Sequence, residues 1–299
     1  MGTTSACRST ASLACWRQGM EANLEAERVL LEGCTGVAWE LDSARFFLLY
    51  CHLYLGQMKT MATRYPLLIK DAQERGDLYA LAMFRGLHSH FIYLCADNTA
   101  EGREVSHEAI SRWSQAGSQV HHMWGLWSGA DFDIYERRGS IAWKKIRQQW
   151  ASMVAALSLK VQFTNIAMLD LRGRSALATI DEGAASGEEC RRLLREAERA
   201  ARRIERERTE WGPGLASLLR AGIDVRRGDP SAAMQRLRAA EERFGALEMS
   251  LHRAVAQRRL GELAGGSEGE SLIAASESWM RSEGIRNPER LAYVYAPWE

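Results

Sequence analysis

Histidines and cysteines are the residue types in this chain most typical of a metal site. His88 and His90 flank Ser89, and His121 is followed directly by His122. On a helix, neighbours at i+1 or i+2 diverge, whereas paired zinc ligands usually sit at i+3 or i+4. We therefore expect no metal site. The six cysteines form no CxxC pair, and we expect them to be reduced core residues; they are at positions 7, 15, 34, 51, 95 and 190.

Asp131-Phe132-Asp133 is the acidic motif that could serve catalysis. An all-helical enzyme of the terpene-cyclase type needs several carboxylates converging on magnesium and diphosphate, and no second acidic motif accompanies this one. Such a metal-dependent enzyme is a remote alternative. The chain has no Gly-Lys dipeptide, which a P-loop requires. Asp131-Phe132-Asp133 is the tripeptide most similar to the Asp-Phe-Gly motif of kinases. The sequence predicts no catalytic residue and no cofactor.

Tryptophans are concentrated in residues 113–150, where they could form a pocket for an apolar or cationic ligand; they are Trp113, Trp124, Trp127, Trp143 and Trp150. A small-molecule-sensing role of this aromatic region is the second functional interpretation. The spacing also suits large side chains that wedge adjacent helices together, which is the interpretation we favour.

Residues 188–208 carry eight arginines and six glutamates of mixed order. The pairs Glu188/Arg192, Arg192/Glu196 and Glu198/Arg202 have the i,i+4 spacing of ion pairs on a helix. A solvated helix with many ion pairs explains this pattern best, and a small patch for RNA or phosphate is the alternative.

The composition indicates an ordered protein without a strong global field. The 299 residues are 46% apolar and 26% charged, with a net charge of +1. That balance favours neither nucleic acid nor anionic membrane as a partner. No stretch approaches the roughly 20 apolar residues of a membrane helix, and the first fifteen residues lack the pattern of a secretory signal. We expect a cytoplasmic protein.

A turn recurs about every 40 to 45 residues between stretches with helical periodicity; its markers are Gly56, Ala96, Gly139, Gly183 and Gly228. The spacing predicts an all-α fold, an α-α superhelix of about six tetratricopeptide-like hairpins. First helices are expected at 42–55, with Asp42 as the N-cap, and at 78–95, 118–138, 161–180, 214–227 and 246–261. Second helices follow each turn, and the one that contains Trp113 is expected to stop at Gly117. Residues 19–286 would form the superhelix, residues 1–18 a poorly structured segment or remnant of a preceding repeat, and residues 287–299 a tail on the last repeat.

Aligning the first helices on their turns places polar residues at offsets of three and seven, on one helical face. In many superhelical repeats the first helices line the concave surface, so this stripe is the candidate groove for a protein or peptide. A merely solvated face is the alternative. The candidate binding residues are Arg45, Arg85, His88, Asp131, Tyr135, Arg172 and Arg220. The columns between them, such as Phe46, Leu87 and Phe132, suit a packed interior.

Three segments carry a resemblance to a known family: residues 34–41 around Trp39, the stop at residues 73–80, and the ending from Trp279 to Arg290 with Ala296-Pro297-Trp298. The turns resemble tetratricopeptide repeats, although they are longer than the usual 34 residues and lack the Trp-Leu-Gly-Tyr pattern. Together the segments resemble the C-terminal helical-repeat region of large bacterial serine/threonine kinases that also carry a P-loop ATPase module.

The resemblance implies a regulatory or scaffolding segment without its catalytic half, because the kinase and nucleotide-binding modules precede the repeats in that family. We therefore expect a non-catalytic module for protein–protein contacts in bacterial signalling. Its partner would be a kinase–ATPase module, in cis within a longer product or in trans if the gene is split.

Overall fold

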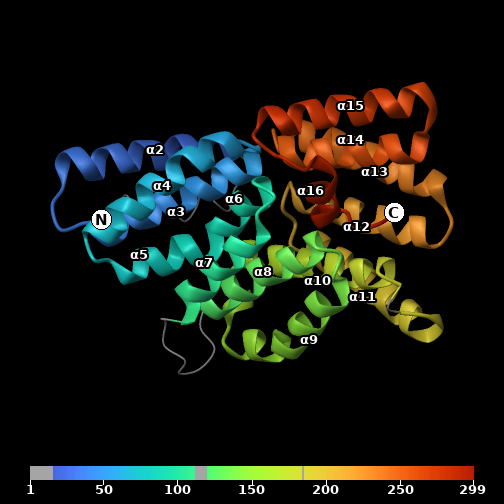
Figure 1. Ribbon diagram of the computed structural model, residues 1–299, viewed down its shortest axis with the longest axis horizontal. Coiled ribbons are helices and arrows are strands. Elements are labelled where there is room, and N and C mark those ends of the chain that lie inside the picture. The colour runs from blue at the N-terminus through green and yellow to red at the C-terminus, as the bar shows by residue number, and fades with distance from the viewer. Residues whose placement is uncertain (1–15, 112–119, 184) are drawn as a thin grey trace.

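The computed structural model describes residues 16–111, 120–183 and 185–299, and Figure 1 shows their arrangement. Throughout these ranges the chain is helical, without a strand. The all-α prediction is confirmed, and the helices pack in consecutive pairs along the chain. Trp113 and Gly117, which the sequence placed at the end of a second helix, lie outside the described residues.

The helices fall into two sets that alternate along the chain. The inner helices are α3 (Ala38–Leu55), α5 (Leu78–Met83) continued through the π-turn η1 (Phe84–His88) into α6 (Ser89–Cys95), α8 (Val120–Tyr135), α10 (Gln162–Asp181), α12 (Gly212–Arg226) and α14 (Ser250–Ala264). The outer helices are α2 (Trp16–Gly33), α4 (Met58–Glu74), α7 (Thr99–Ser111), α9 (Gly139–Ala155), α11 (Gly187–Arg206), α13 (Pro230–Ala246) and α15 (Gly266–Ser282). A 3-10 turn, η2 (Ser158–Lys160), precedes α10, and α16 (Pro288–Tyr295) ends the fold.

The first five turns from an inner to the next outer helix contain a residue in the left-handed region: Gly56, Asp97, Arg137, Gly183 and Gly228. The last such turn, between α14 and α15, has Gly265 and Gly266 there. This conformation ends a helix by letting the next amides bond back to its last carbonyls. At Gly56, for example, the turn amides donate to the carbonyls of His52 and Leu53. Two predicted markers are wrong in detail, since Asp97 and Arg137 take the role that we gave to Ala96 and Gly139.

Helix starts follow from side-chain caps at several positions. Asp77 accepts the Ala80 amide at 2.9 Å and Asp229 accepts the Ala232 amide at 2.9 Å. The prediction that Asp42 caps its helix is wrong. α3 begins at Ala38, and the buried Asp42 carboxylate instead accepts Arg75 Nη2 at 2.8 Å from the end of α4.

Burial explains the two sets. The inner helices are buried on nearly all sides, because each packs against the outer helices that precede and follow it in the chain and also faces the core. The outer helices bury one stripe, as α11 does with Leu193, Ala197, Ala200, Ala201 and Ile204. This is the pattern of an amphipathic helix on a hydrophobic core.

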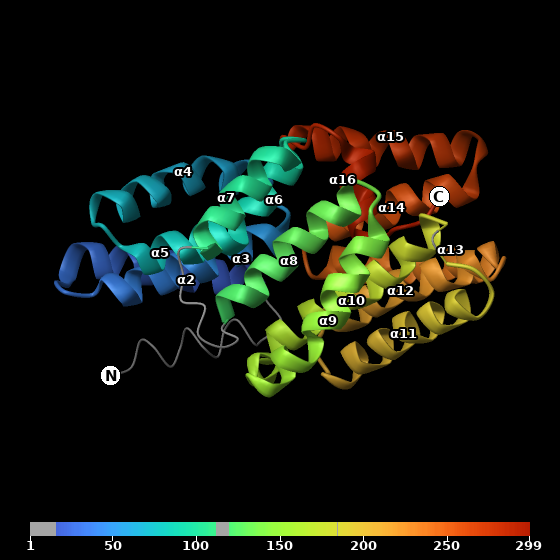
Figure 2. The same ribbon diagram turned by 60° about the horizontal axis from the view of Figure 1, so that its bottom comes forward.

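The stack of hairpins closes on itself, because the last repeat returns to contact the first. Helix α14 packs against α3, and a Cβ built at Gly56 would lie 2.7 Å from the Leu251 amide nitrogen. The Lys59 amide donates to Glu283 at 3.1 Å, and Arg17 pairs with Glu248 at 2.6 Å. The seam therefore joins the two ends of the chain of repeats into a ring (Figure 2).

The C-terminal segment lies at the centre of this ring (Figure 1). Helix α16 contacts α8 as well as α14 and α15, so its packing extends well beyond the last repeat, where the sequence placed the tail. The predicted division at residue 18 also shifts, since α2 begins at Trp16, whose indole stacks on Tyr54 at 4.2 Å inside the ring.

Candidate functional site

The predicted polar stripe does not form an open groove. Arg45, His88, Asp131 and Tyr135 are buried, and only the remaining three, Arg85, Arg172 and Arg220, are partly exposed. The expectation of a solvent-exposed stripe is therefore wrong for those four residues. The physical reason is the ring closure, which turns the inner helices' common face toward the core instead of toward water.

The arginines of the stripe join neighbouring helices. Arg45 on α3 reaches Glu27 on α2 at 3.0 Å and Asp71 on α4 at 2.6 Å. In the same way Arg172 on α10 pairs with Glu196 at 2.7 Å, and Arg220 on α12 pairs with Glu198 and Glu205, all on α11. These side chains are held by internal carboxylates and are poorly placed to bind a partner.

A buried ionic cluster joins the inner helices at the centre of the ring. Asp131 on α8 accepts Arg174 Nη1 at 2.8 Å and Trp127 Nε1 at 3.0 Å, and it lies 3.3 Å from His90 Nε2 on α6. Arg174 on α10 also pairs with Asp170 at 2.6 Å. The same guanidinium donates to the Val294 carbonyl at 2.7 Å, so the cluster connects the inner helices to α16.

The charges of this cluster depend on one another. Burial opposes ionisation of Asp131, but Arg174 and His90 outweigh it and lower the pKa of that carboxyl. Burial raises the pKa of Asp170 despite the same guanidinium. Burial alone would lower the pKa of Arg174, but Asp131 and Asp170 raise it above its usual value. The cluster is a fixed set of opposite charges inside the core.

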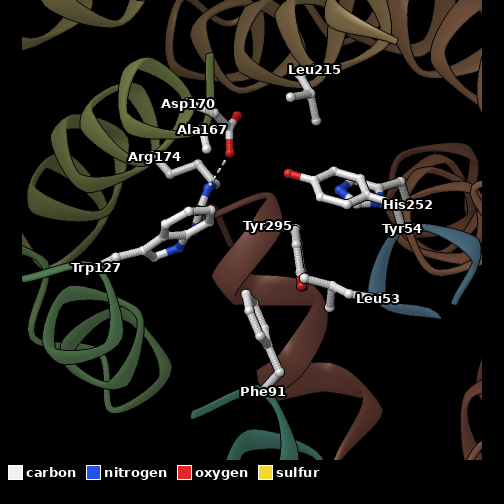
Figure 3. Close-up of a pocket in the computed structure, with 10 residues that line it drawn as sticks. All are labelled: Leu53, Tyr54, Phe91, Trp127, Ala167, Asp170, Arg174, Leu215, His252 and Tyr295. Atoms are coloured by element: carbon white, nitrogen blue, oxygen red, sulfur yellow. Dashed lines mark hydrogen bonds and ion pairs between the residues drawn. The ribbon is translucent and has the colours of Figure 1, made fainter. Parts of the chain in front are cut away.

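A cavity of about 20 Å³ lies beside the cluster (Figure 3). It is lined by Leu53, Tyr54, Phe91, Trp127, Ala167, Asp170, Arg174, Leu215, His252 and Tyr295. This volume has room for about one water molecule and is too small for an organic substrate. Burial lowers the pKa of the lining His252 to about 3, so this imidazole is neutral at physiological pH.

Side chains at successive turns hold the C-terminal segment; we call Asp97, Arg137, Asp181 and Arg226 the collar. Asp181 accepts the Tyr293 hydroxyl at 2.7 Å and the Glu299 amide at 3.0 Å, and it pairs with Arg226. Arg137 lies 3.5 Å over the Tyr293 ring and pairs with Glu299 at 2.6 Å. The recurring turns thus converge on one segment, which occupies the position that a bound peptide would take on the inner face.

Asp97 holds the beginning of the same segment. Its carboxylate accepts the Tyr135 hydroxyl at 2.6 Å and the Asn287 side-chain amide at 3.4 Å, while the Arg286 amide donates to the Cys95 carbonyl at 2.8 Å. Tyr135, a predicted partner-binding residue, is therefore used inside the fold to hold Asp97 in place.

The predicted metal-site interpretations can be compared with the geometry. His88 is enclosed by Phe46 and Tyr50, and Asp133 is paired with Arg103 at 2.8 Å and Lys145 at 2.7 Å. Asp131 faces the opposite side, toward Arg174. Among the described residues, no group of three His, Cys, Asp or Glu side chains is placed to hold a metal ion.

The cysteines of the described ranges are free thiols, at positions 34, 51, 95 and 190. Burial raises the pKa of the Cys95 thiol to about 12, so this residue is an inert core side chain.

The tryptophans of the aromatic region pack into separate places. Trp124 lies against Phe46 and His121 in the core, and Trp127 bonds to Asp131. Trp143 and Trp150 on α9 pack under Arg172, whose guanidinium carbon lies 5.5 Å and 4.4 Å from the two rings. Within the described part of residues 113–150, these side chains wedge helices together, as we favoured from their spacing.

Helix α11 carries the predicted run of alternating charges. Of the three predicted pairs, Glu198–Arg202 is present at 2.8 Å. Arg192 pairs with Glu189 at 2.5 Å, and Glu196 turns inward to Arg172. The carboxylates therefore face the neighbouring helices more than the sequence suggested, which leaves arginines on the outer side.

Large apolar side chains are exposed at the edge where outer helices lead into inner ones. Trp39 at the start of α3 is 55% exposed and Leu78 at the start of α5 is 68% exposed. Tyr79 beside it contacts His121 at the start of α8. None of the helices in the described ranges is long and apolar enough to cross a bilayer.

Comparison of this chain with protein-family models, with curated proteins and with solved structures finds no match. Site residues must therefore be judged from geometry alone. Our sequence analysis missed Arg174, Asp170 and Asp181. A signal was present for the first two, because Asp170 and Arg174 are an i,i+4 charge pair within α10.

Proposed function

We propose that this chain is a non-catalytic helical-repeat module for protein–protein contacts. The observation that carries the proposal is the use of the inner titratable side chains: Asp131 and Asp170 both pair with Arg174 beside a cavity of about 20 Å³. A catalytic site needs a pocket that admits substrate, and beside it polar or charged side chains that are free to interact with that substrate. This centre offers fixed internal pairs, which suit a scaffold better than an enzyme.

Exposed apolar side chains support contacts through the outside of the ring. Trp39, near the start of α3, and Leu78 and Tyr79, at the start of α5, are exposed, and exposed aromatic and aliphatic groups of this kind are frequent at interfaces. The inner face is filled by the chain's own C-terminal segment. A partner therefore binds the outer helices and the exposed edges.

The signalling role rests on the resemblance of the residues around Trp39 and of the ending from Trp279 onward to kinase-associated repeats. In this proposal the module regulates or scaffolds a bacterial serine/threonine kinase–ATPase in the cytoplasm, in cis or in trans. The small-molecule sensor is less favoured, because the described tryptophans of the aromatic region pack between helices, and the central cavity that Trp127 lines is only about 20 Å³.

Three measurements test the proposal. The purified chain should neither hydrolyse ATP nor transfer phosphate, and robust activity would refute the non-catalytic role. The DNA around the coding region should encode kinase and ATPase modules, in frame or as a neighbouring gene. Co-expression with those modules should yield a stable complex in size-exclusion chromatography, and their separate elution would refute the scaffolding role.

A further inference from the structure

The outer face of α11 carries a row of arginines. Those classed as exposed are Arg191, Arg195, Arg199, Arg202, Arg203 and Arg206. Steps of three and four residues keep them on one face of the helix. In Figures 1 and 2 α11 lies on the periphery of the ring, with α10 and α12 on its inner side.

Four of these arginines form no ion pair within the described ranges of the chain. Most other arginines of the chain pair with carboxylates, and on α11 itself Arg199 and Arg202 pair with Glu196 and Glu198. Arg191, Arg195, Arg203 and Arg206 have none among the residues that the structure describes. The row therefore presents four guanidinium groups without a carboxylate partner in the described part of the chain.

Helix stability does not explain this arrangement. Arg191/Arg195, Arg195/Arg199 and Arg199/Arg203 are like charges at i,i+4, which destabilise a helix. Arg203 and Arg206 offset the negative end of the helix dipole, whereas Arg191 and Arg195 lie nearer the positive end and gain nothing from it. A row of opposite charges laid alongside would remove the repulsion.

We propose that the outer face of α11 is the docking surface for an acidic helix of a protein partner. This inference rests on the proposed interaction role and specifies its partner chemistry. Carboxylates at i, i+4, i+12 and i+15 of a partner helix match the spacing of Arg191, Arg195, Arg203 and Arg206. Guanidinium–carboxylate pairs form bidentate hydrogen bonds. Such a surface sets the register and rate of association through charge complementarity.

An acidic protein segment fits this surface better than nucleic acid does. Helix α11 contains no aromatic residue on which bases could stack, and single-stranded nucleic acids bind largely by such stacking. The net charge of +1 also gives no wider positive field to attract a polyanion.

The test uses the full chain and a fluorescein-labelled helical peptide with glutamates at i, i+4, i+12 and i+15 in an alanine background. The quadruple variant Arg191→Gln, Arg195→Gln, Arg203→Gln and Arg206→Gln should fold, because it removes repulsion and keeps good helix formers. The control, Lys59→Gln, Lys70→Gln, Arg227→Gln and Arg286→Gln, makes the same charge change at exposed positions elsewhere. Circular dichroism checks both folds.

Fluorescence anisotropy should show binding to the unmodified chain that weakens at high ionic strength. The α11 variant should bind at least about tenfold more weakly, and the control within about twofold of the unmodified chain. Equal loss in both variants, or no binding by the unmodified chain, would overturn the inference. So would tighter binding of a poly(U) oligonucleotide through the same arginines.

Complex formation with the co-expressed kinase–ATPase modules separates the two proposals. If the unmodified chain forms that complex but does not bind the glutamate peptide, the α11 inference fails and the interaction role stands. If it forms neither, both fail. Loss of the complex in the α11 variant alone supports both.

Discussion

Arg174 is the residue on which the inner helices and the C-terminal segment depend together. It is 2% exposed, and its guanidinium contacts Asp131, Asp170 and the Val294 carbonyl. A buried charge of this kind costs free energy to desolvate and is tolerable only while its partners are present. The cluster therefore gives specificity of packing at the centre more than it gives net stability.

Replacing Arg174→Met should lower the free energy of unfolding by about 3–5 kcal/mol, because two buried carboxylates lose their partner. Adding Asp131→Asn and Asp170→Asn should recover part of this loss. Urea denaturation followed by circular dichroism measures both. The control is Arg192→Gln, which removes a solvent-exposed ion pair with Glu189 and should change the free energy of unfolding by less than about 1 kcal/mol. Equal effects at Arg174 and Arg192 would contradict the argument.

Buried histidines should make the protein sensitive to acid. Burial lowers the pKa of His88 and of His252 to about 3, against an unfolded value near 6.5. The unfolded state then binds more protons between these limits. Stability is full above about pH 6.5 and falls as the pH drops toward 3, by about 1.4 kcal/mol per pH unit for each histidine. The lowered pKa of Asp131 acts in the same direction, and the raised pKa of Asp170 opposes it.

The variant His252→Phe keeps a ring against Tyr54 and removes the titrating group. Its stability should fall less steeply between pH 6 and pH 4, with the slope reduced by about 1.4 kcal/mol per pH unit. Urea denaturation at several pH values measures the slope. The exposed His107→Gln serves as the control, and an unchanged slope in the His252 variant would be evidence against neutral burial.

At the scale of elements, close helix contacts depend on small residues. A Cβ at Gly139, the first residue of α9, would lie 2.3 Å from the Ala178 carbonyl carbon and 2.5 Å from its oxygen. Both atoms belong to the α10 backbone, which cannot yield as a side chain can. Gly139 thus sets the distance between an outer helix and its inner neighbour.

Gly139→Ala should destabilise the protein by about 1–3 kcal/mol through this overlap. Gly129→Ala is the matched control, because Gly129 lies within α8 and a Cβ there meets nothing within 4 Å. The control should be stabilised by about 0.5–1 kcal/mol through helix propensity. Thermal unfolding distinguishes them, and similar shifts of both variants would exclude the steric explanation.

The helices themselves were well predicted because local signals define them. Asp77 and Asp229 cap helices through their side chains and are followed by an apolar residue and a proline, respectively. Gly56, Gly183 and Gly228 supply the left-handed conformation of the turns. Asp42 misled the prediction, since a carboxylate before an apolar stretch looks the same whether it caps a helix or pairs with an arginine from a neighbour.

At the scale of the whole molecule, both the ring closure and the central C-terminal segment add contacts between distant parts of the chain. Open solenoids are stabilised by nearest-neighbour contacts alone. Here Gly56 packs against Leu251 at the seam, and Tyr293 donates a hydrogen bond to Asp181. Both contacts join residues far apart in the chain. The C-terminal segment is consequently part of the core.

Asp181→Ala should loosen the C-terminal segment, since it removes the acceptor of the Tyr293 hydroxyl and the Glu299 amide and the partner of Arg226. Tryptic cleavage at Arg286 and Arg290 should rise by about tenfold or more, because cleavage follows the population of the open form. Mass spectrometry identifies the cuts. The exposed Glu242→Ala should leave cleavage unchanged; resistance of the Asp181 variant would rule out the collar's role.

The sequence by itself determined the helical class, the register of the hairpins and the apolar columns of the inner helices, such as Phe46 and Leu87. These follow from local periodicity and turn chemistry. Only the tertiary structure decided that Asp131 and Tyr135 face inward, and that Asp181 meets Tyr293 from the C-terminal segment. The difference is physical: periodicity shows which residues share a face, but the accumulated rotation of the hairpins decides whether that face meets water or the other end of the chain.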